Sequence, residues 1–192
     1  MFSDIVFPNG NEDEFVSMAL RLGYSSLYFV YGPKDFKRFV SDKVKVFCGV
    51  ISKQVVNKLN PDFVIARADE GVRSVLEQGK VDLVFDFELG DRKDFIHHRN
   101  SGLNQVLCKI MEENDISLGF SFNSILNKAS PQLLGRIMQN AGFARKYKLK
   151  MVIASFAHNP FEMRAPKDLL AFGEILGISH DCLRCFFIQK VC

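Results

Sequence analysis

Short apolar runs alternate with amphipathic segments along this chain, and this alternation restricts the fold more than any other feature of the sequence. Eight runs are expected to be strands, and most are continuously hydrophobic, as strands buried on both faces are. They are residues 4–7, 26–31, 44–51, 62–66, 82–87, 116–120, 151–155 and 184–189. The pattern predicts repeated strand–helix units around a parallel sheet.

The segments between these runs carry helix signals. The segment 12–22 has helical periodicity and ends at Gly23, a residue suited to a left-handed C-cap. A further helix is expected from Val72. Pro131 and Pro166 each occupy a position typical of the first turn of a helix, because proline has no backbone N–H to leave unpaired there.

Length and composition indicate one domain spanning residues 1–192, with 47% apolar and 24% charged residues. The 19 phenylalanines and the lack of tryptophan predict a core filled by planar rings. We expect a compact TIM-like (β/α) barrel of about seven to eight parallel strands, with short connections because a typical barrel has roughly 250 residues. An open doubly wound sheet is the alternative, and no G-x-G-x-x-G or Walker motif marks it.

Charge and cysteine content limit which partners and which cellular location the protein is expected to have. The net charge of +3 permits contact with RNA without requiring it. Five cysteines and the absence of a secretion signal predict reduced thiols and a cytoplasmic location. No apolar stretch approaches about 20 residues, so no membrane partner is expected.

Two blocks of sequence carry a more specific signal. Residues 98–110 read H-R-N-S-G-L-N-Q-V-L-C-K-I and lead into S-L-G-F-S-F at 117–122. The second block contains M-V-I-A-S at 151–155, M-R-A-P-K-D-L at 163–169 and G-E-I-L-G at 173–177. In their order and spacing the two blocks resemble the signatures of the archaeal and eukaryotic RNase P protein component 3 family.

The resemblance implies a barrel related to the PHP-type phosphoesterases and therefore favours the barrel over the open sheet. It also implies a noncatalytic subunit of a ribonucleoprotein that matures the 5′ end of precursor tRNA, with the cleavage performed by RNA and its bound magnesium. The protein itself is expected to hold no cofactor. The implied partners are RNase P RNA, precursor tRNA, a small ferredoxin-like protein subunit and other RNase P proteins.

Arg99 is the first candidate for contact with RNA, because a forked guanidinium beside a helix N-terminus suits a phosphate. Asn100 or Ser101 is expected to cap that helix at the barrel mouth. Its apolar stripe would consist of Leu103, Val106, Leu107, Ile110 and Met111. Alternatively, Arg99 forms a structural ion pair with Asp86 or Glu88.

Further RNA-binding candidates are Arg164 and Lys167, which flank Pro166 and are expected to lie on one exposed edge. Arg164 precedes a helix, where a cation opposes the helix dipole unless it faces a carboxylate or a phosphate. Lys109 and Lys146 complete the set, although a lysine at a helix C-terminus, such as Lys146, also stabilises the helix without any ligand.

No catalytic or metal-binding residue is predicted. His97, His98 and His158 are poorly spaced for metal binding, and the only C-x-x-C, from Cys182 to Cys185, is a weak signal. Residues 7–11 read F-P-N-G-N where PHP-type enzymes carry an H-x-H pair, which removes the ligands of a hydrolytic metal centre. The hydroxyls of Ser121 and Ser155 are expected to serve structure, and His158 is either a surface histidine or a general base.

Three functions remain open at this point. The first is a noncatalytic RNase P subunit. The second is a stand-alone PHP-type barrel hydrolase or phosphoesterase. The third is a structural adaptor that does not contact RNA.

Overall fold

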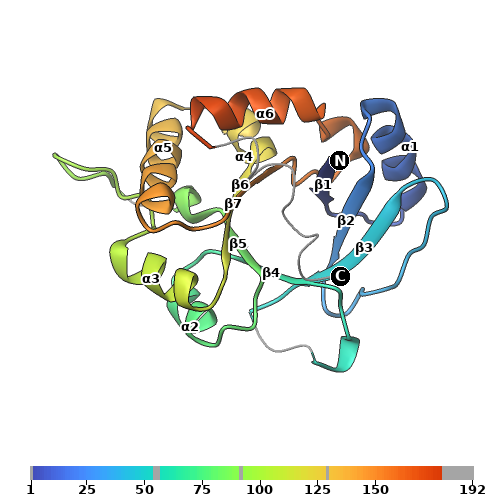
Figure 1. Ribbon diagram of the computed structural model, residues 1–192, viewed down its shortest axis with the longest axis horizontal. Coiled ribbons are helices and arrows are strands. Elements are labelled where there is room, and N and C mark those ends of the chain that lie inside the picture. The colour runs from blue at the N-terminus through green and yellow to red at the C-terminus, as the bar shows by residue number, and fades with distance from the viewer. Residues whose placement is uncertain (1, 54–56, 91–92, 129, 179–192) are drawn as a thin grey trace.

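Seven parallel strands form one sheet that curls into a nearly closed barrel in the computed structural model (Figure 1). The structure describes residues 2–53, 57–90, 93–128 and 130–178. The strands lie in chain order as β1 (Ser3–Val6), β2 (Ser26–Tyr31), β3 (Lys45–Ile51), β4 (Val64–Arg67), β5 (Leu83–Phe85), β6 (Ser117–Ser121) and β7 (Met151–Ala154). The predicted barrel is confirmed, and the eighth expected strand, residues 184–189, lies outside the described residues.

The ring closes between β1 and β7, and we call this junction the seam. Val6 and Ala157 form a parallel bridge, and the Phe7 amide donates a hydrogen bond of 2.8 Å to the Ala157 carbonyl. Beside this bridge the amide and hydroxyl of Ser155 both donate to the buried carboxylate of Asp4, at 2.7 and 2.6 Å. The seam therefore depends on a side-chain carboxylate as well as on backbone pairing.

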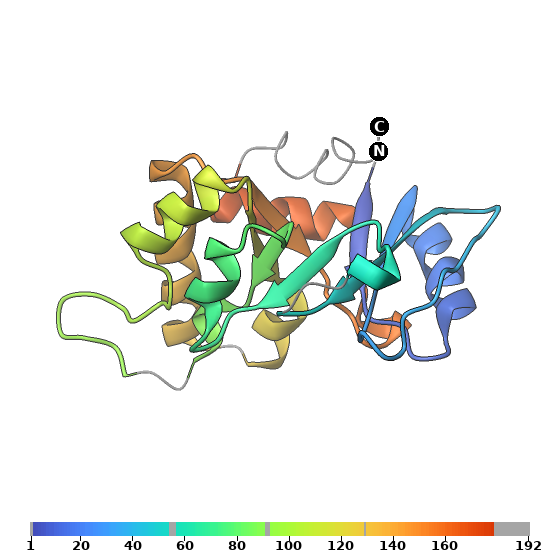
Figure 2. The ribbon, with the colours of Figure 1, turned by 90° about the horizontal axis from the view of Figure 1, so that it is seen from below.

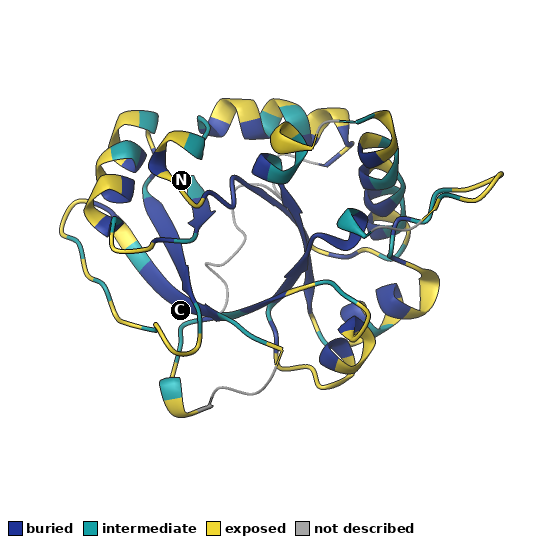
Figure 3. Ribbon diagram, turned by 180° about the vertical axis from the view of Figure 1, so that it is seen from behind, coloured by how far each residue is buried: buried dark blue, intermediate teal, exposed yellow. Residues whose placement is uncertain are grey.

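Helices cover much of the outside of the barrel, and their buried faces point toward the strands (Figure 3). The helices are α1 (Glu12–Leu22), α2 (Val72–Glu77), α3 (Gln105–Glu113), α4 (Phe122–Asn127), α5 (Pro131–Lys146) and α6 (Pro166–Ile175). Within the described residues, short 3₁₀ turns follow β3, β5 and β7: η1 (Asn57–Leu59), η2 (Phe87–Leu89) and η3 (Pro160–Glu162). Gly23 ends α1 at φ 84°, and prolines begin α5 and α6, as predicted. Among the described helices none is long and apolar enough to cross a bilayer.

Aromatic rings fill the barrel interior, as the phenylalanine content predicts. The interior cluster combines Ile5, Tyr28, Val30, Phe47, Phe63, Ile65, Leu83, Phe85, Val152, Ala154 and Phe156. Two strand glycines make room for these rings. A Cβ at Gly49 would lie against the Phe63 ring, and one at Gly119 would press on the side chains of Leu83, Phe85 and Phe156. The glycines are therefore required for packing at these two positions.

Candidate nucleic-acid interface

Residues 93–104, which we call the signature loop, project beyond α3 and α5 (Figures 1 and 2). Asp94 anchors this loop by accepting hydrogen bonds from three groups: Arg99 Nη1 at 3.0 Å, Arg136 Nε at 2.8 Å and the Asn100 amide at 3.0 Å. The Arg136 hydrogen bond, assisted by those from Asn100 and Arg99, lowers the pKa of Asp94 below its ordinary value. The anchor is therefore charged at neutral pH.

Helix α5 provides a second support for the same loop. The Gln139 side chain accepts from the Arg99 amide at 3.1 Å and donates to the Arg99 carbonyl at 2.8 Å and to the Ser101 hydroxyl at 2.9 Å. Gly135 lies one turn earlier, and a Cβ there would collide with the Arg99 side chain. Arg99 thus lies across α5 at a point where glycine lets it approach the helix closely.

The predicted helix cap is wrong. Helix α3 begins at Gln105, and its N-cap is Asn104, whose side chain accepts from the Leu107 amide at 3.0 Å. Neither Asn100 nor Ser101 caps it, because the Asn100 amide binds Asp94 and the buried Ser101 hydroxyl accepts from Gln139. Both residues instead help to fix the signature loop.

The apolar stripe of α3 is confirmed only in part. Leu107 and Met111 are buried, and Leu103 is buried in the loop before the helix. Ile110 is half-buried, and Val106 is 52% exposed and faces solvent. The later helix start explains the change, because it places Val106 in the first turn, near the projecting loop.

Arg99 does not pair with Asp86 or Glu88, nor does it line the barrel mouth. Asp86 is bound by the guanidinium of Arg67 at 2.7 Å, and Glu88 is buried beside the Asn140 amide at 3.3 Å. Arg99 pairs with Asp94 and leaves 42% of its side chain exposed. The exposed part retains donors for a phosphate, because the fork has five and Asp94 engages Nη1.

A groove of about 570 Å³ lies between the signature loop, the start of α2 and helix α5. Arg99 lines it together with Arg73, Phe95 and His98. The rings of Phe95 and His98 are stacked at 4.5 Å on the loop, and both residues are exposed. The groove also contains Asp69 and Glu70, and Arg73 pairs with Glu77, so Arg99 and the exposed aromatic pair are the features that suit single-stranded RNA.

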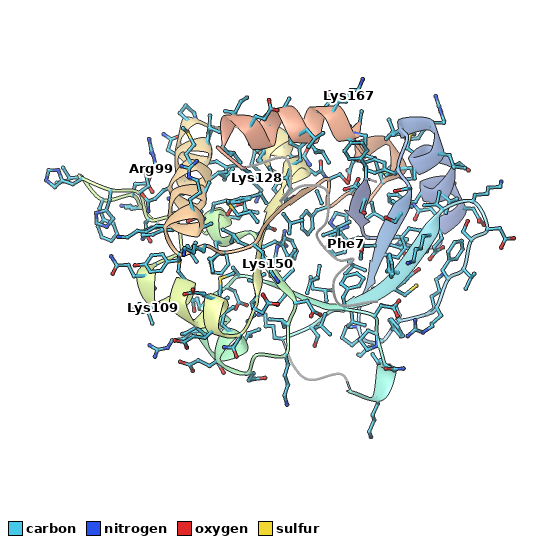
Figure 4. All side chains as sticks on the ribbon, in the orientation of Figure 1. Phe7, Arg99, Lys109, Lys128, Lys150 and Lys167 are labelled. Atoms are coloured by element: carbon cyan, nitrogen blue, oxygen red, sulfur yellow. The ribbon has the colours of Figure 1, made fainter. Side chains whose placement is uncertain are left out.

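Arg164 is held by main-chain groups. Its Nη1 donates to the carbonyls of Phe161 at 3.1 Å and Met163 at 2.9 Å, and its own carbonyl accepts from the Tyr24 hydroxyl at 2.6 Å. The carboxylate expected opposite Arg164 is not found among the described residues. Lys167 is exposed in the first turn of α6, as predicted for this edge (Figure 4).

The remaining lysine candidates lie elsewhere. Lys109 is exposed on α3, on a different side of the molecule from Lys167 on α6 (Figure 4). Lys146 lies over the Tyr147 ring with 5.7 Å between its ammonium and the ring centroid. The basic residues selected from the sequence therefore do not form one continuous patch.

The carboxyl ends of the strands surround a cavity of about 350 Å³, which we call the mouth cavity. Its lining residues come from every strand end except that of β2, and they are Phe7, Ile51, Arg67, Phe85, Asp86, Leu89, Ser121, Asn123, Ser124, Asn127, Lys128, Phe156 and His158. The sequence drew attention to the ends of strands, but Arg67 and Lys128 were not among its candidates. Arg67 directly follows the expected strand 62–66, whereas Lys128 lies eight residues after the expected strand 116–120 and had no such signal.

Serine and carboxylate side chains near the strand ends serve structure. Ser121 caps α4 by accepting from the Ser124 amide at 3.2 Å, as expected of a structural hydroxyl. Burial raises the pKa of Asp4 to about 7, although hydrogen bonds from Ser155 and Ile5 lower it. Burial together with the nearby charge of Asp86 raises the pKa of Glu88 to about 8.

Within the described ranges, no three His, Cys, Asp or Glu residues converge as a metal site.

Comparison with known proteins identifies the relatives of this chain. It is 35% identical over 97 residues to ribonuclease P protein component 3 of Methanosarcina barkeri, covering 47% of this chain and 41% of the relative. It is 30% identical over 147 residues to the component 3 protein of Methanocaldococcus jannaschii, covering 69% of this chain and 60% of the relative. No protein-family model matches the chain.

Among solved structures, the fold is similar to a chain in the cryo-EM structure of archaeal ribonuclease P with mature tRNA. The TM-score is 0.70 at 19% identity, over 97% of this chain and 87% of that chain. The resemblance to the RNase P protein component 3 family is confirmed. The chain spans about half the length of the curated relatives it matches.

Proposed function

We propose that this chain, a relative of RNase P protein component 3, acts as a protein subunit of an RNase P that matures the 5′ end of precursor tRNA. The observation that carries the proposal is that the fold holds the signature residues in a fixed, projecting loop. The R-N-S-G-L-N segment is held on Asp94 and Gln139 as a projecting loop that presents Arg99 beside a groove.

The proposed RNA contacts divide between two surfaces. Arg99, with the stacked Phe95 and His98, forms the first. Arg164 and Lys167 form the second, at the start of α6. Both offer cations without a buried catalytic group beside them, which suits positioning of RNA more than chemistry on it. Lys109 and Lys146 are weaker candidates, since each lies apart from these surfaces.

In this proposal the RNA and its magnesium cleave the substrate, and the protein binds no cofactor of its own. A small ferredoxin-like subunit and other RNase P proteins would complete the cytoplasmic assembly. The stand-alone hydrolase is not favoured, because the curated relatives are RNase P components. A structural adaptor without RNA contact differs from the proposal in one measurable property, the effect of replacing its basic residues on RNA binding and cleavage.

Reconstitution with archaeal RNase P RNA and the other protein subunits tests the proposal. Adding this chain should raise precursor-tRNA cleavage, and the chain alone should cleave nothing. Replacing Arg164 and Lys167 together by alanine should weaken binding and cleavage of the precursor. It should also lower the slope of log affinity against log salt by roughly one unit for each phosphate that the two side chains bind. Lys58→Ala on η1 is the matched control.

No stimulation by the full chain would contradict the proposal. Stimulation that is unchanged in Arg99→Ala and in the Arg164→Ala, Lys167→Ala double variant would favour the structural adaptor. Circular dichroism of each variant separates loss of folding from loss of RNA binding.

A further inference from the structure

The mouth cavity has an aromatic floor. The rings of Phe85 and Phe156 are stacked with centroids 4.6 Å apart and 19° between their planes. Beside them Phe7 is stacked on His158 at 4.6 Å and 11°. His158 is exposed and lines the cavity, so a flat ligand in the cavity can reach its imidazole. An imidazole fixed in this way is a stacking platform for a nucleobase.

Two cations stand at the rim of the same cavity. Arg67 binds Asp86 through Nε and Nη2, each at 2.7 Å, yet 59% of its side chain is exposed and the guanidinium retains further donors. Lys128 is exposed at the end of α4, and its charge acts on Asp86, where burial raises the pKa and the nearby cations oppose that rise. Among the described lining residues Asp86 is the one carboxylate against two cations, so this part of the rim favours an anion.

A polar wall lies between floor and rim. Asn123 is fixed by donating to Glu162 at 2.9 Å, and it accepts from Asn127 at 3.0 Å. Asn127 is exposed, so its amide oxygen can accept from a ligand. Ser124 donates to Asp86 at 3.4 Å and adds a hydroxyl to this wall.

The combination of these three features selects a ligand class. A wholly apolar ligand would leave Lys128 and the remaining donors of Arg67 unused, and a bare anion would leave the aromatic floor unused. A volume of about 350 Å³ lies within the range of small-ligand sites, roughly 300–1,000 Å³. A nucleotide has the aromatic ring, the hydroxyls and the phosphate that the floor, wall and rim can each bind.

We propose that the mouth cavity binds one nucleotide, with the base stacked on His158 and the 5′-phosphate at Lys128 and Arg67. Figure 4 labels Phe7 and Lys128, which contribute to the floor and the rim. The inference rests on the cavity alone and is independent of the proposed RNase P function. The nucleotide is either a free mononucleotide or an unstacked terminal nucleotide of an RNA.

The proposal is tested by titrating the full chain with AMP, adenosine and inorganic phosphate. Calorimetry or NMR measures the binding. AMP should bind more tightly than either of its parts. Lys128→Gln should weaken AMP binding about tenfold, as removal of a charge-assisted hydrogen bond predicts, and should leave adenosine binding unchanged. His158→Ala should weaken binding of both AMP and adenosine. Lys58→Gln on η1, an exposed lysine that does not line the cavity, is the matched control and should bind AMP as the natural chain does.

A short single-stranded RNA, with and without its 5′-phosphate, distinguishes the two sources. If the phosphorylated RNA binds more tightly than AMP does, and Lys128→Gln weakens that binding, the ligand of the cavity is an RNA end. If the phosphorylated RNA binds as tightly as AMP or more weakly, the ligand is a free nucleotide. No binding of AMP or RNA, or binding unaffected by both Lys128→Gln and His158→Ala, overturns the proposal. Precursor-tRNA cleavage is measured separately, so failure here leaves the proposed function standing.

Discussion

The barrel seam and the signature loop are each fastened by one aspartate that accepts hydrogen bonds from three groups, but the two carboxylates differ in charge state. Asp4 at the seam is fully buried and accepts from the Ile5 amide and from the amide and hydroxyl of Ser155. Asp94 in the loop accepts from two guanidinium groups and one amide.

Burial raises the pKa of Asp4 to about 7, whereas the donors around Asp94 lower its pKa. Three neutral donors do not compensate for full loss of solvent, but two cations at the surface do more than compensate for partial loss. The seam is therefore strongest when its aspartate is protonated, and the loop anchor is strongest when its aspartate is ionised.

The largest expected effect is at the seam. Asp4→Ala should lower the free energy of unfolding by about 3 kcal/mol at pH 5, because it leaves the buried amide and hydroxyl of Ser155 without an acceptor. Asp4→Asn keeps an acceptor and should cost less than about 1 kcal/mol. Urea unfolding measures both. Equal stability of Asp4→Ala and the natural chain would mean that backbone pairing alone holds the seam.

The pH dependence should follow from the raised pKa of Asp4. The folded state keeps a proton up to about pH 7, whereas the unfolded aspartate releases it near its ordinary pKa of 3.8, so folding takes up a proton in this window. Stability should fall as pH rises from about 4 to 7, with a slope of at most about 1.4 kcal/mol per pH unit from this group. Glu88 adds the same trend up to about pH 8.

Asp4→Asn isolates the contribution of the seam to that slope. Urea unfolding at several pH values should give a shallower decline for Asp4→Asn than for the natural chain between about pH 4 and 7. Parallel curves would show that Asp4 is ionised in both states and would remove the contrast with Asp94.

The loop anchor should respond locally. Asp94→Ala frees Arg99 and the Asn100 amide, so the signature loop should open more often. Chymotryptic cleavage after Phe95, which is 57% exposed, should become about tenfold faster while global unfolding changes little. Asp115→Ala removes a surface pair with Lys150 and is the control. An unchanged cleavage rate would assign the support of the loop to Gln139 alone.

The smallest effect separates the loop from the helix that follows it. Asn104→Ala should cost about 1 kcal/mol through loss of the cap on the Leu107 amide. Asn100→Ala should cost less, since its side chain only reaches the Lys93 carbonyl at 3.4 Å. Thermal unfolding compares the two variants. The reverse order would place the cap at Asn100 after all.

The sequence by itself determined the alternation of strands and helices around a parallel sheet, and the resemblance of its two signature blocks to a known family favoured a barrel over an open sheet. Runs that are apolar at every position can be satisfied only as strands covered on both faces, so β2 and β7 were found close to their observed bounds. Prolines and Gly23 marked helix ends because their backbone preferences act locally. The R-N-S-G-L-N motif pointed to the family and to Arg99 through residue identity alone.

Only the tertiary structure decided which polar groups meet. Ser101 and Asn104 are both residue types that cap helices well. Which of them caps α3 depends on Gln139, which lies 38 residues after Ser101 and donates a hydrogen bond to its hydroxyl. Arg136 reaches Asp94 across 42 residues. The mouth cavity gathers Arg67 and Lys128 because parallel strands bring their carboxyl ends to one rim. Local propensity acts over a few residues, whereas these contacts exist only after the ring of strands has closed.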